Sequence, residues 1–204
     1  MYLISMNAEE LEKLKKKTAD ADLPLKEGHN LVFGKGNPDA RILFIGEAPG
    51  EREDAAGVPF VGSAGKQLDK LLGSIGLGID DVYIANILKY RPPDNRNPND
   101  EEIRAHTPYL VDQIKIIRPK VIVTLGNFAT KFIMAGFDAD KMSAIEGITK
   151  LHGKMSQIKL DSSVFLVMPI YHPAAMLYNP NLRTDIESDF ILLGKIINPS
   201  SSTT

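Results

Sequence analysis

The sequence predicts an α/β fold of three layers, with a central four-stranded, mainly parallel sheet and helices on both faces. The first observation is a set of four short apolar runs rich in β-branched residues, at 41–45, 82–88, 120–125 and 164–168. Runs without polar alternation are typical of strands that are buried on both faces. The second observation is that helical patterns separate these runs, because strand–helix alternation implies parallel strands covered on both sides.

Four helical patterns lie between and after the predicted strands. Residues 63–75 place their leucines on one side of a helix, and residues 100–117 follow an Asn or Asp cap with acids in the first turn. Residues 127–136 begin after a glycine, and residues 185–197 close the fold. The first three patterns repeat apolar residues at helical spacing, which predicts one buried face for each helix.

The remaining segments are assigned by their composition. The pattern of residues 1–17 predicts a short exposed helix, with the KLKKK run on its solvated face. The pattern of residues 150–159 predicts an extra extended segment or hairpin. Residues 92–99 (PPDNRNPN) form a long turn-rich loop rather than a domain boundary. We therefore expect a single domain over residues 1–198, followed by a disordered tail at 199–204.

The length and composition bound the class of protein. The 204 residues, of which 43% are apolar, suit one compact domain with a substantial core. No apolar run approaches the roughly 18 residues of a membrane span, and the first residues lack the order of a secretory signal. We therefore expect a cytoplasmic protein that has no membrane partner.

Residue usage excludes several kinds of site. The absence of cysteine excludes disulfides, thiolate nucleophiles, cysteine-bound zinc and a cysteine-held iron–sulfur cluster. The four histidines are too scattered to predict a metal site. A net charge of −2 predicts no general attraction to nucleic acid, so any DNA-binding surface must be a local basic patch.

Unusual segments follow all four predicted strands. The first strand leads into GEAPGERED, the second into Asn86 and KYRPPDNR, the third into LGN and the fourth into PIYHPAAMLYNP. Ligands of open parallel sheets bind outside the carboxyl ends of the strands. We therefore expect these four segments, which are separate in the sequence, to converge on one site.

The GEAPGERED segment is a poor phosphate loop. It lacks the Lys-Ser/Thr ending of a nucleotide-binding loop and the spacing of the dinucleotide fingerprint. Pro49 removes one N–H donor, and the neighbouring acids would repel an anion. From these residues alone, the favoured interpretation is a tight strand-to-helix turn with solvated acids.

Three residues near the strand ends each allow a structural and a functional interpretation. Phe60 is either a core aromatic or a ring that a loop presents for stacking on a flat ligand. Asn86 either ties down a neighbouring loop or reads a pyrimidine edge with its adjacent donor and acceptor. His172 is either a structural histidine at a turn or a ring N–H aimed at a leaving group.

The segment after His172 and several cations allow the same two interpretations. Two prolines stiffen this loop, and its exposed apolar residues predict either packing or insertion between bases. These residues are Met176, Leu177 and Tyr178. The cations are either solvated or together form the local basic rim that a DNA site would need. They are Lys89, Arg91, Arg96 and Arg183.

Taken together, these segments resemble the uracil-DNA glycosylase superfamily, and most closely its family four, the thermostable bacterial and archaeal class. The matching stretches are GEAPGERED, GVPFVGSAGKQLD, VYIANILKYRPPDNRNP, PYL…IRPKVIVTLG and YHPAAMLYNP. They run in order and with fitting spacing from about residue 30 to residue 197. Agreement among several independent motifs makes the resemblance specific.

The resemblance implies a role for each of the candidate residues. Phe60 stacks on the flipped uracil, Asn86 reads its polar edge, and His172 supports O2 as the base departs. The loop that begins Gly46, Glu47 and Ala48 lies beside the scissile bond and the attacking water. Family one has an aspartate where Ala48 stands, so Glu47 and backbone groups are expected to manage the water. The loop after His172, with Met176, Leu177 and Tyr178, is implied to enter the DNA and fill the space that the base leaves. From their charge, Arg91, Arg96 and Arg183 are also expected to contact DNA.

The chain departs from family four in one respect. Members of that family usually carry four cysteines that hold a [4Fe–4S] cluster, which cannot form here because the chain has no cysteine. The first pair should fall at residues 18–22, the third should follow Lys89 where Tyr90 stands, and the fourth should fall near His106. We therefore expect no cofactor, and we expect residues 18–25, Tyr90 and His106 to pack where the cluster would lie.

The function that the resemblance implies is that of a monomeric, monofunctional uracil-DNA glycosylase. It would flip uracil out of DNA in the cytoplasm, at the nucleoid, and hydrolyse its N-glycosidic bond to leave an abasic site. The alternative is a non-catalytic protein that binds uracil or damage on the same scaffold. A relative that bonds covalently to the abasic site has Gln where Glu47 stands and a basic, His-containing insertion, and this chain has neither.

Overall fold

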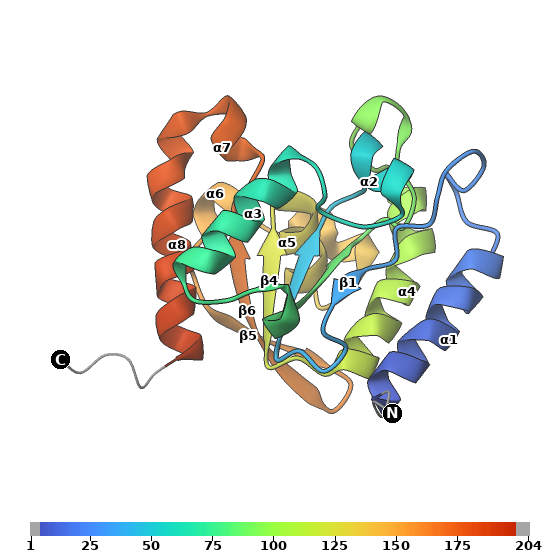
Figure 1. Ribbon diagram of the computed structural model, residues 1–204, viewed down its shortest axis with the longest axis horizontal. Helices are drawn as coiled ribbons and strands as arrows, with labels where there is room; N and C mark the ends of the chain where they lie inside the picture. Colours follow the sequence, from blue (N-terminus) through green and yellow to red (C-terminus); the bar gives the residue numbers. More distant parts are fainter. Residues whose placement is uncertain (1–4, 199–204) are drawn as a thin grey trace.

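The computed structural model describes residues 5–198 and contains one six-stranded sheet with the strand order β1-β3-β2-β4-β6-β5 (Figure 1). The strands are β1 (Lys35–Gly36), β2 (Ile42–Gly46), β3 (Val82–Asn86), β4 (Val121–Leu125), β5 (Ser156–Leu160) and β6 (Ser163–Ile170). The α-helices are α1 (Met6–Asp20), α2 (Glu51–Ala56), α3 (Ser63–Ser74), α4 (Asp100–Ile117), α5 (Asn127–Met134), α6 (Ile148–Leu151), α7 (Ala175–Tyr178) and α8 (Arg183–Ile197). The predicted α/β class is confirmed.

The four predicted strands form the centre of the sheet, in the order β3-β2-β4-β6 and all parallel. The predicted number of strands is wrong, because two antiparallel edge strands flank this centre. β5 pairs with β6 as a hairpin, as residues 150–159 suggested. β1 was not predicted because it has only two residues, which form no apolar run and rely on β3 for their pairing.

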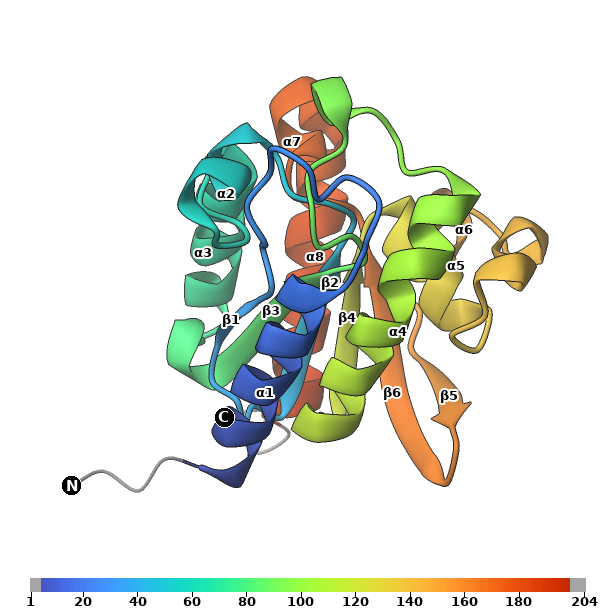
Figure 2. The ribbon, with the colours of Figure 1, turned by 90° about the vertical axis from the view of Figure 1, so that its right-hand side faces the viewer.

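The sheet is covered on both faces, which confirms the predicted three layers. Alternate residues of β2 point to opposite faces, so Leu43 and Ile45 belong to one apolar cluster while Ile42 and Phe44 belong to the other. The first cluster includes residues of α1, α4 and α5, and the second includes residues of α3 and α8. Figure 2 shows α1 and α4 side by side on one face of the sheet.

The four long helices after the first strand match the predicted ones to within a few residues. Asn99 caps α4, because its Oδ1 accepts from Glu102 N at 2.8 Å while the Glu102 carboxylate accepts from Asn99 N at 2.9 Å. The expectation of an exposed N-terminal helix is wrong, because Leu11, Leu14 and Thr18 of α1 are buried. The basic run of α1 does stay on the solvent side.

Two predictions concern the whole chain. No helix within residues 5–198 is long and apolar enough to cross a membrane. The predicted tail at residues 199–204 lies outside the described residues, and so do residues 1–4.

Candidate active site

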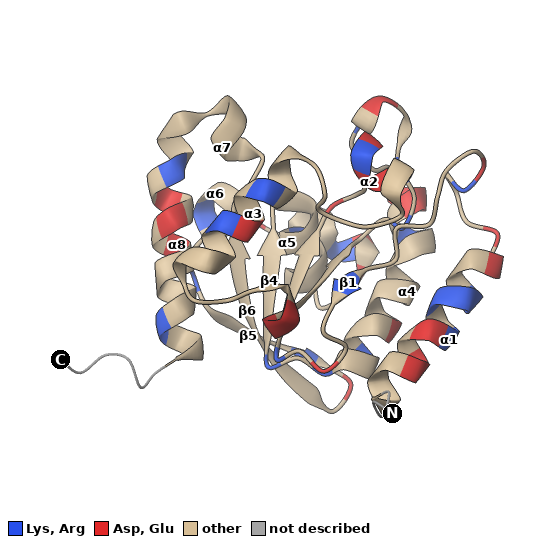
Figure 3. Cartoon of the chain, viewed as in Figure 1, with Lys and Arg blue, Asp and Glu red and all other residues tan. Residues whose placement is uncertain are grey.

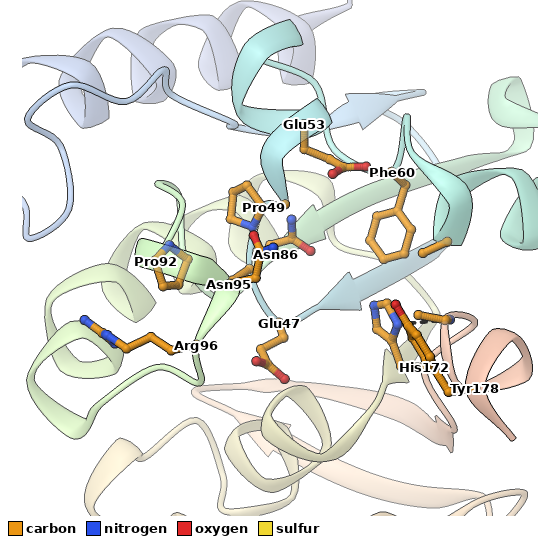
Figure 4. A pocket seen from close by; sticks show the side chains of 14 residues that line it. Glu47, Pro49, Glu53, Phe60, Asn86, Pro92, Asn95, Arg96, His172 and Tyr178 are labelled. Carbon is orange, nitrogen blue, oxygen red and sulfur yellow. Dashed lines mark hydrogen bonds between the residues drawn. The ribbon is translucent and has the colours of Figure 1, made fainter.

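A pocket of about 380 Å³ opens at the carboxyl ends of the central strands (Figure 4). Its walls come from the loop after β2, the loop after β3 and the segment after β6, so three of the four predicted segments line one cavity. The fourth segment lies against this wall, because a Cβ on Gly126 would come within 3.2 Å of His172 Cβ. The lining residues are Glu47, Ala48, Pro49, Gly50, Glu53, Phe60, Ala64, Asn86, Pro92, Asn95, Arg96, His172, Ala174 and Tyr178.

Asn86 ends β3 at the base of this pocket and carries an unpaired buried atom. Its side chain is only 2% exposed, and its Oδ1 has no hydrogen-bond partner. Among the described residues it is the one buried side-chain N or O atom in this condition. Since buried polar atoms are normally paired and leaving one unpaired costs free energy, this oxygen marks a place for a ligand donor.

Gly46 allows Asn86 and Phe60 to approach each other. The two residues Gly46 and Asn86 are neighbours in the parallel ladder of β2 and β3. A Cβ on Gly46 would overlap Asn86 Oδ1 and would come within 2.9 Å of two ring atoms of Phe60. Only glycine at this position leaves room for both the amide and the ring.

The backbone at Phe60 is strained and is held from several sides. Its φ of 52° lies in the left-handed region, which costs a bulky residue about 1 kcal/mol or more. Lys35 Nζ donates to Phe60 O at 2.9 Å, and Glu53 Oε1 accepts from the N–H groups of Val61 and Gly62 at 2.9 and 2.7 Å. These contacts fix the direction in which the Phe60 ring meets the pocket.

His172 follows β6 and is held in one tautomer. Its Nδ1 accepts from the N–H of Ala174 at 3.2 Å, so the ring proton lies on Nε2. Burial lowers the pKa of His172 to about 4, and the ring is therefore neutral at physiological pH. A neutral ring with its proton on Nε2 is a hydrogen-bond donor rather than a cation.

The rings of Phe60 and His172 are in direct contact. Their centroids are 5.6 Å apart and the rings are inclined by 29°, which is the range of touching aromatic rings. A flat base therefore does not fit between them. Figure 4 shows the two rings side by side at one end of the pocket.

Glu47 is the carboxylate nearest the end of β2 and points into the pocket (Figure 4). Burial raises its pKa to about 6. Its main-chain oxygen accepts from the N–H of Leu88 at 3.0 Å, which extends the pairing of β2 and β3 by one residue. A desolvated carboxylate of this kind suits proton transfer near neutral pH or the stabilisation of a nearby cation.

The structure divides the predicted DNA-contacting residues into two groups. Tyr178 and Leu177 are 85% and 44% exposed, and Tyr178 borders the pocket. The expectation that Met176 is exposed is wrong: it is 7% exposed, because α7 turns its side chain into the core against α3 and α8. The predicted stiff loop is instead two short helical turns, at residues 175–178 and 180–182.

The predicted cations also differ in their surroundings. Arg96 lines the pocket, but its guanidinium is bound by both carboxylate oxygens of Glu102, at 2.5 and 2.9 Å. Arg91 donates to Asn95 Oδ1 at 2.9 Å, and Arg183 is exposed at the start of α8. Figure 3 shows lysine or arginine on α3 and at the start of α8, next to α7. The interpretation of Lys89 as a surface cation is wrong, because its side chain is fully buried.

Sequence reasoning missed three contributors to the site. Glu53 lines the pocket and holds the Phe60 loop, although the acids of this segment were expected to be solvated. Asn95 and Pro92 close the side of the pocket next to Arg96. The position of Glu53 on the first turn of α2, eight residues before Val61, was the only signal that it could reach that loop.

The residues at the implied cluster position do not fit an iron–sulfur cluster. His106 is fully buried, with Nδ1 accepting from Lys89 N at 3.1 Å and Nε2 donating to Pro24 O at 3.0 Å, so neither ring nitrogen is free to bind metal. Tyr90 packs edge-on against this ring, with centroids 6.0 Å apart. Thr18 Oγ1 donates to Leu14 O at 2.7 Å. His106 therefore joins Tyr90 and the main chain at Pro24 in one polar and aromatic plug.

We expect His106 to make the stability of the protein depend on pH. Burial lowers its pKa to about 4, whereas an unfolded histidine titrates near 6.5, so the unfolded state binds more protons between these values. The stabilisation is complete above pH 6.5 and falls by about 3 kcal/mol as the pH drops to about 4. Urea unfolding of the wild type and of His106→Gln at both pH values measures this difference.

The variant isolates His106 from other groups that titrate in the same range. The pKa of His172 is lowered in the same direction and that of Glu47 is raised, but both groups are unchanged in His106→Gln. The gap in stability between wild type and variant should therefore shrink as the pH falls. A gap that stays constant from pH 7 to pH 4 would contradict the expectation.

Comparison with known proteins gives a consistent set of relatives. The family model described as the Uracil DNA glycosylase superfamily matches residues 33–191. A type-4 uracil-DNA glycosylase of Archaeoglobus fulgidus is 48% identical over 174 residues, which cover 85% of each chain. One of Sulfurisphaera tokodaii is 51% identical over 162 residues, or 79% of this chain and 72% of the relative. One of Pyrobaculum aerophilum is 37% identical and covers 94% of this chain and 99% of its own.

Proposed function

The chain belongs to the uracil-DNA glycosylase superfamily, and from this premise we propose that it is a monofunctional DNA glycosylase that hydrolyses uracil from DNA and leaves an abasic site. The relatives with the type-4 name support this activity for the chain. The substrate is uracil-containing DNA, and the reaction begins base excision repair. We propose that a single domain over residues 1–198 acts as a monomer in the cytoplasm, at the nucleoid.

The observation that carries the proposal is the unpaired Oδ1 of Asn86 in a pocket with an aromatic wall. The side-chain amide offers an acceptor and a donor next to each other, which complement N3–H and O4 of uracil. Cytosine has an acceptor at N3 and a donor amine at C4, so it presents the reversed pattern. Asn86 therefore supports selection of uracil over cytosine, while Phe60 stacks on the face of the base.

The proposed reaction breaks the bond between C1′ of the sugar and N1 of uracil. The bonding electrons leave with the base, which becomes an anion, while the sugar becomes a cation that water attacks at C1′. The Nε2–H of His172 donates to O2 and stabilises the anion without giving up its proton. Glu47 faces the sugar, where its carboxylate stabilises the cation or accepts the proton of the water.

Base flipping is part of the proposal, because the pocket suits a single base and not a duplex. The base must therefore leave the helix before it can react. Tyr178 and Leu177 are exposed beside the pocket and are proposed to fill the gap that the flipped base leaves. Arg91, Arg96 and Arg183 are proposed to contact phosphates. Arg96 would do so only if phosphate competes with Glu102 for its guanidinium.

The proposal is tested by incubating the protein with single- and double-stranded oligonucleotides that contain one uracil. We expect free uracil and an alkali-sensitive abasic site. Tight binding without release would indicate the alternative, a non-catalytic binding protein. The absence of both release and selective binding over a broad temperature range would overturn the proposal.

We expect the rate of uracil release to depend on the ionisation of Glu47. Because its pKa is raised to about 6 and the carboxylate is the active form, kcat/KM should rise about tenfold per pH unit below pH 6 and level off above it. Glu47→Gln should be slow and should lack this rising limb. An unchanged limb in Glu47→Gln would show that another group titrates. The dependence of kcat/KM on pH, measured between pH 4.5 and 8 for the wild type and for Glu47→Gln, tests both expectations. Single-turnover kinetics serve as a check.

A further inference from the structure

Lys89 is a charged residue buried beside the end of β3. Its Nζ donates to the main-chain oxygen of Asn86 at 2.8 Å and to Oε1 of Gln113 at 2.6 Å. Both acceptors are neutral, and burial lowers the pKa of Lys89 to about 7. Burying an ammonium without a carboxylate partner costs free energy. The hydrogen bonds to these two acceptors are therefore needed to offset that cost.

Gln113 holds the far side of the Lys89 ammonium. It lies on α4 and is fully buried, and its Nε2 donates to Phe33 O at 2.9 Å while its Oε1 accepts from Lys89. The ring of Phe33 lies 5.9 Å from Lys89 Nζ. The side chain of Lys89 thus connects the end of β3 to α4 and to the segment before β1.

The main chain around Lys89 is fixed as well. Its N–H donates to His106 Nδ1 at 3.1 Å, and its oxygen accepts from Val32 N at 2.9 Å. On the other side of this segment, Ile87 N donates to Gly46 O at 3.0 Å. The backbone that carries Asn86 is therefore held between the loop after β2 and the Lys89 network.

We propose that Lys89 is a positioning residue: it holds the main-chain carbonyl of Asn86 and thereby fixes the direction in which the Asn86 amide meets uracil, while Gln113 orients the ammonium. This inference rests on the proposed function, because it assumes that Asn86 reads the base. The polar plug of His106 and Tyr90 anchors the same segment where family four would place a cluster. Lys89 extends that anchorage to the residue that contacts the substrate.

A double-mutant cycle tests whether Lys89 acts through Asn86. Lys89→Met keeps an unbranched side chain that is one atom shorter and removes the donor. With Asn86 present, we expect Lys89→Met to lower kcat/KM for uracil release about tenfold, because a small misplacement of a contacting group is enough for such a loss. In the Asn86→Ala background we expect Lys89→Met to change kcat/KM less than about twofold. Equal factors in both backgrounds would overturn the inference.

Thr130→Val is the control, since it removes a buried hydrogen bond, between the hydroxyl groups of Thr130 and Thr124, and leaves the contacts of residues 86–89 unchanged. We expect it to lower stability and to show no coupling to Asn86. All rates are measured well below the unfolding midpoint of each variant, which urea unfolding supplies. If Lys89→Met does not fold, Gln113→Met tests the same coupling, because it releases the second partner of the ammonium.

The cycle separates failure of this inference from failure of the proposed function. If Asn86→Ala releases uracil at the wild-type rate, Asn86 does not read the base, and both the role of Asn86 and that of Lys89 are overturned. If Asn86→Ala is impaired and the two substitutions act independently, only the role of Lys89 is overturned.

Discussion

Asn86→Ala is expected to lower kcat/KM for uracil release roughly 10³-fold, because a site built around hydrogen bonds to the base loses both its donor and its acceptor. The same substitution should hardly change stability. Its Oδ1 has no partner in the folded protein, so alanine removes an unpaired buried oxygen as well as some packing. We expect the free energy of unfolding to change by less than about 1 kcal/mol.

Two measurements check this separation of activity from stability. Single-turnover release of uracil gives the loss in rate, and urea unfolding gives the stability. Asn86→Asp is the matched control, because it keeps the size of the side chain but replaces the donor with an oxygen that repels O4 of uracil. Asn86→Ala should be stable and slow, whereas Asn86→Asp should be slow and less stable, because it places a carboxylate at a buried position without a partner. A folded Asn86→Asp with the wild-type rate would contradict the assigned contact.

The centre of the fold could be predicted because its signals are local. Each central strand is a continuous apolar run, and each long helix has an apolar face that the sequence alone displays. The edges of the sheet carry weaker signals. β1 is a pair of residues that becomes a strand only by pairing with Tyr83 and Ile84, and such a tertiary contact leaves no periodic pattern.

The candidate site divides in the same way. Its place was predictable, because the topology of a parallel sheet brings the segments after its strands to one edge. The burial of individual loop residues was not. Lys89 and Met176 follow strands in polar or turn-rich segments and were expected at the surface, but both lie inside. Their surroundings come from α4 and α8, which no local pattern connects to them.

Gly46→Ala is expected to slow uracil release, because the added methyl group would crowd the two side chains that meet at Gly46. The added Cβ would overlap Asn86 Oδ1 and press on the Phe60 ring, and neither neighbour moves freely. Asn86 is buried at the end of a strand, and the Phe60 loop is held by Lys35 and Glu53. We expect a loss of about 10²-fold or more in kcat/KM and a destabilisation of about 1–3 kcal/mol.

Gly73→Ala separates this effect from the general effect of adding a methyl group. Gly73 lies in α3, and a Cβ there would meet nothing within 4 Å. It should stabilise the protein by up to about 1 kcal/mol and leave the rate unchanged, because alanine favours helix more than glycine does. If Gly46→Ala released uracil as fast as Gly73→Ala, the close approach of Asn86 and Phe60 would not be needed for the reaction. If Gly46→Ala is slow but nearly as stable as the wild type, the loss of rate comes from the changed geometry of the pocket and not from unfolding.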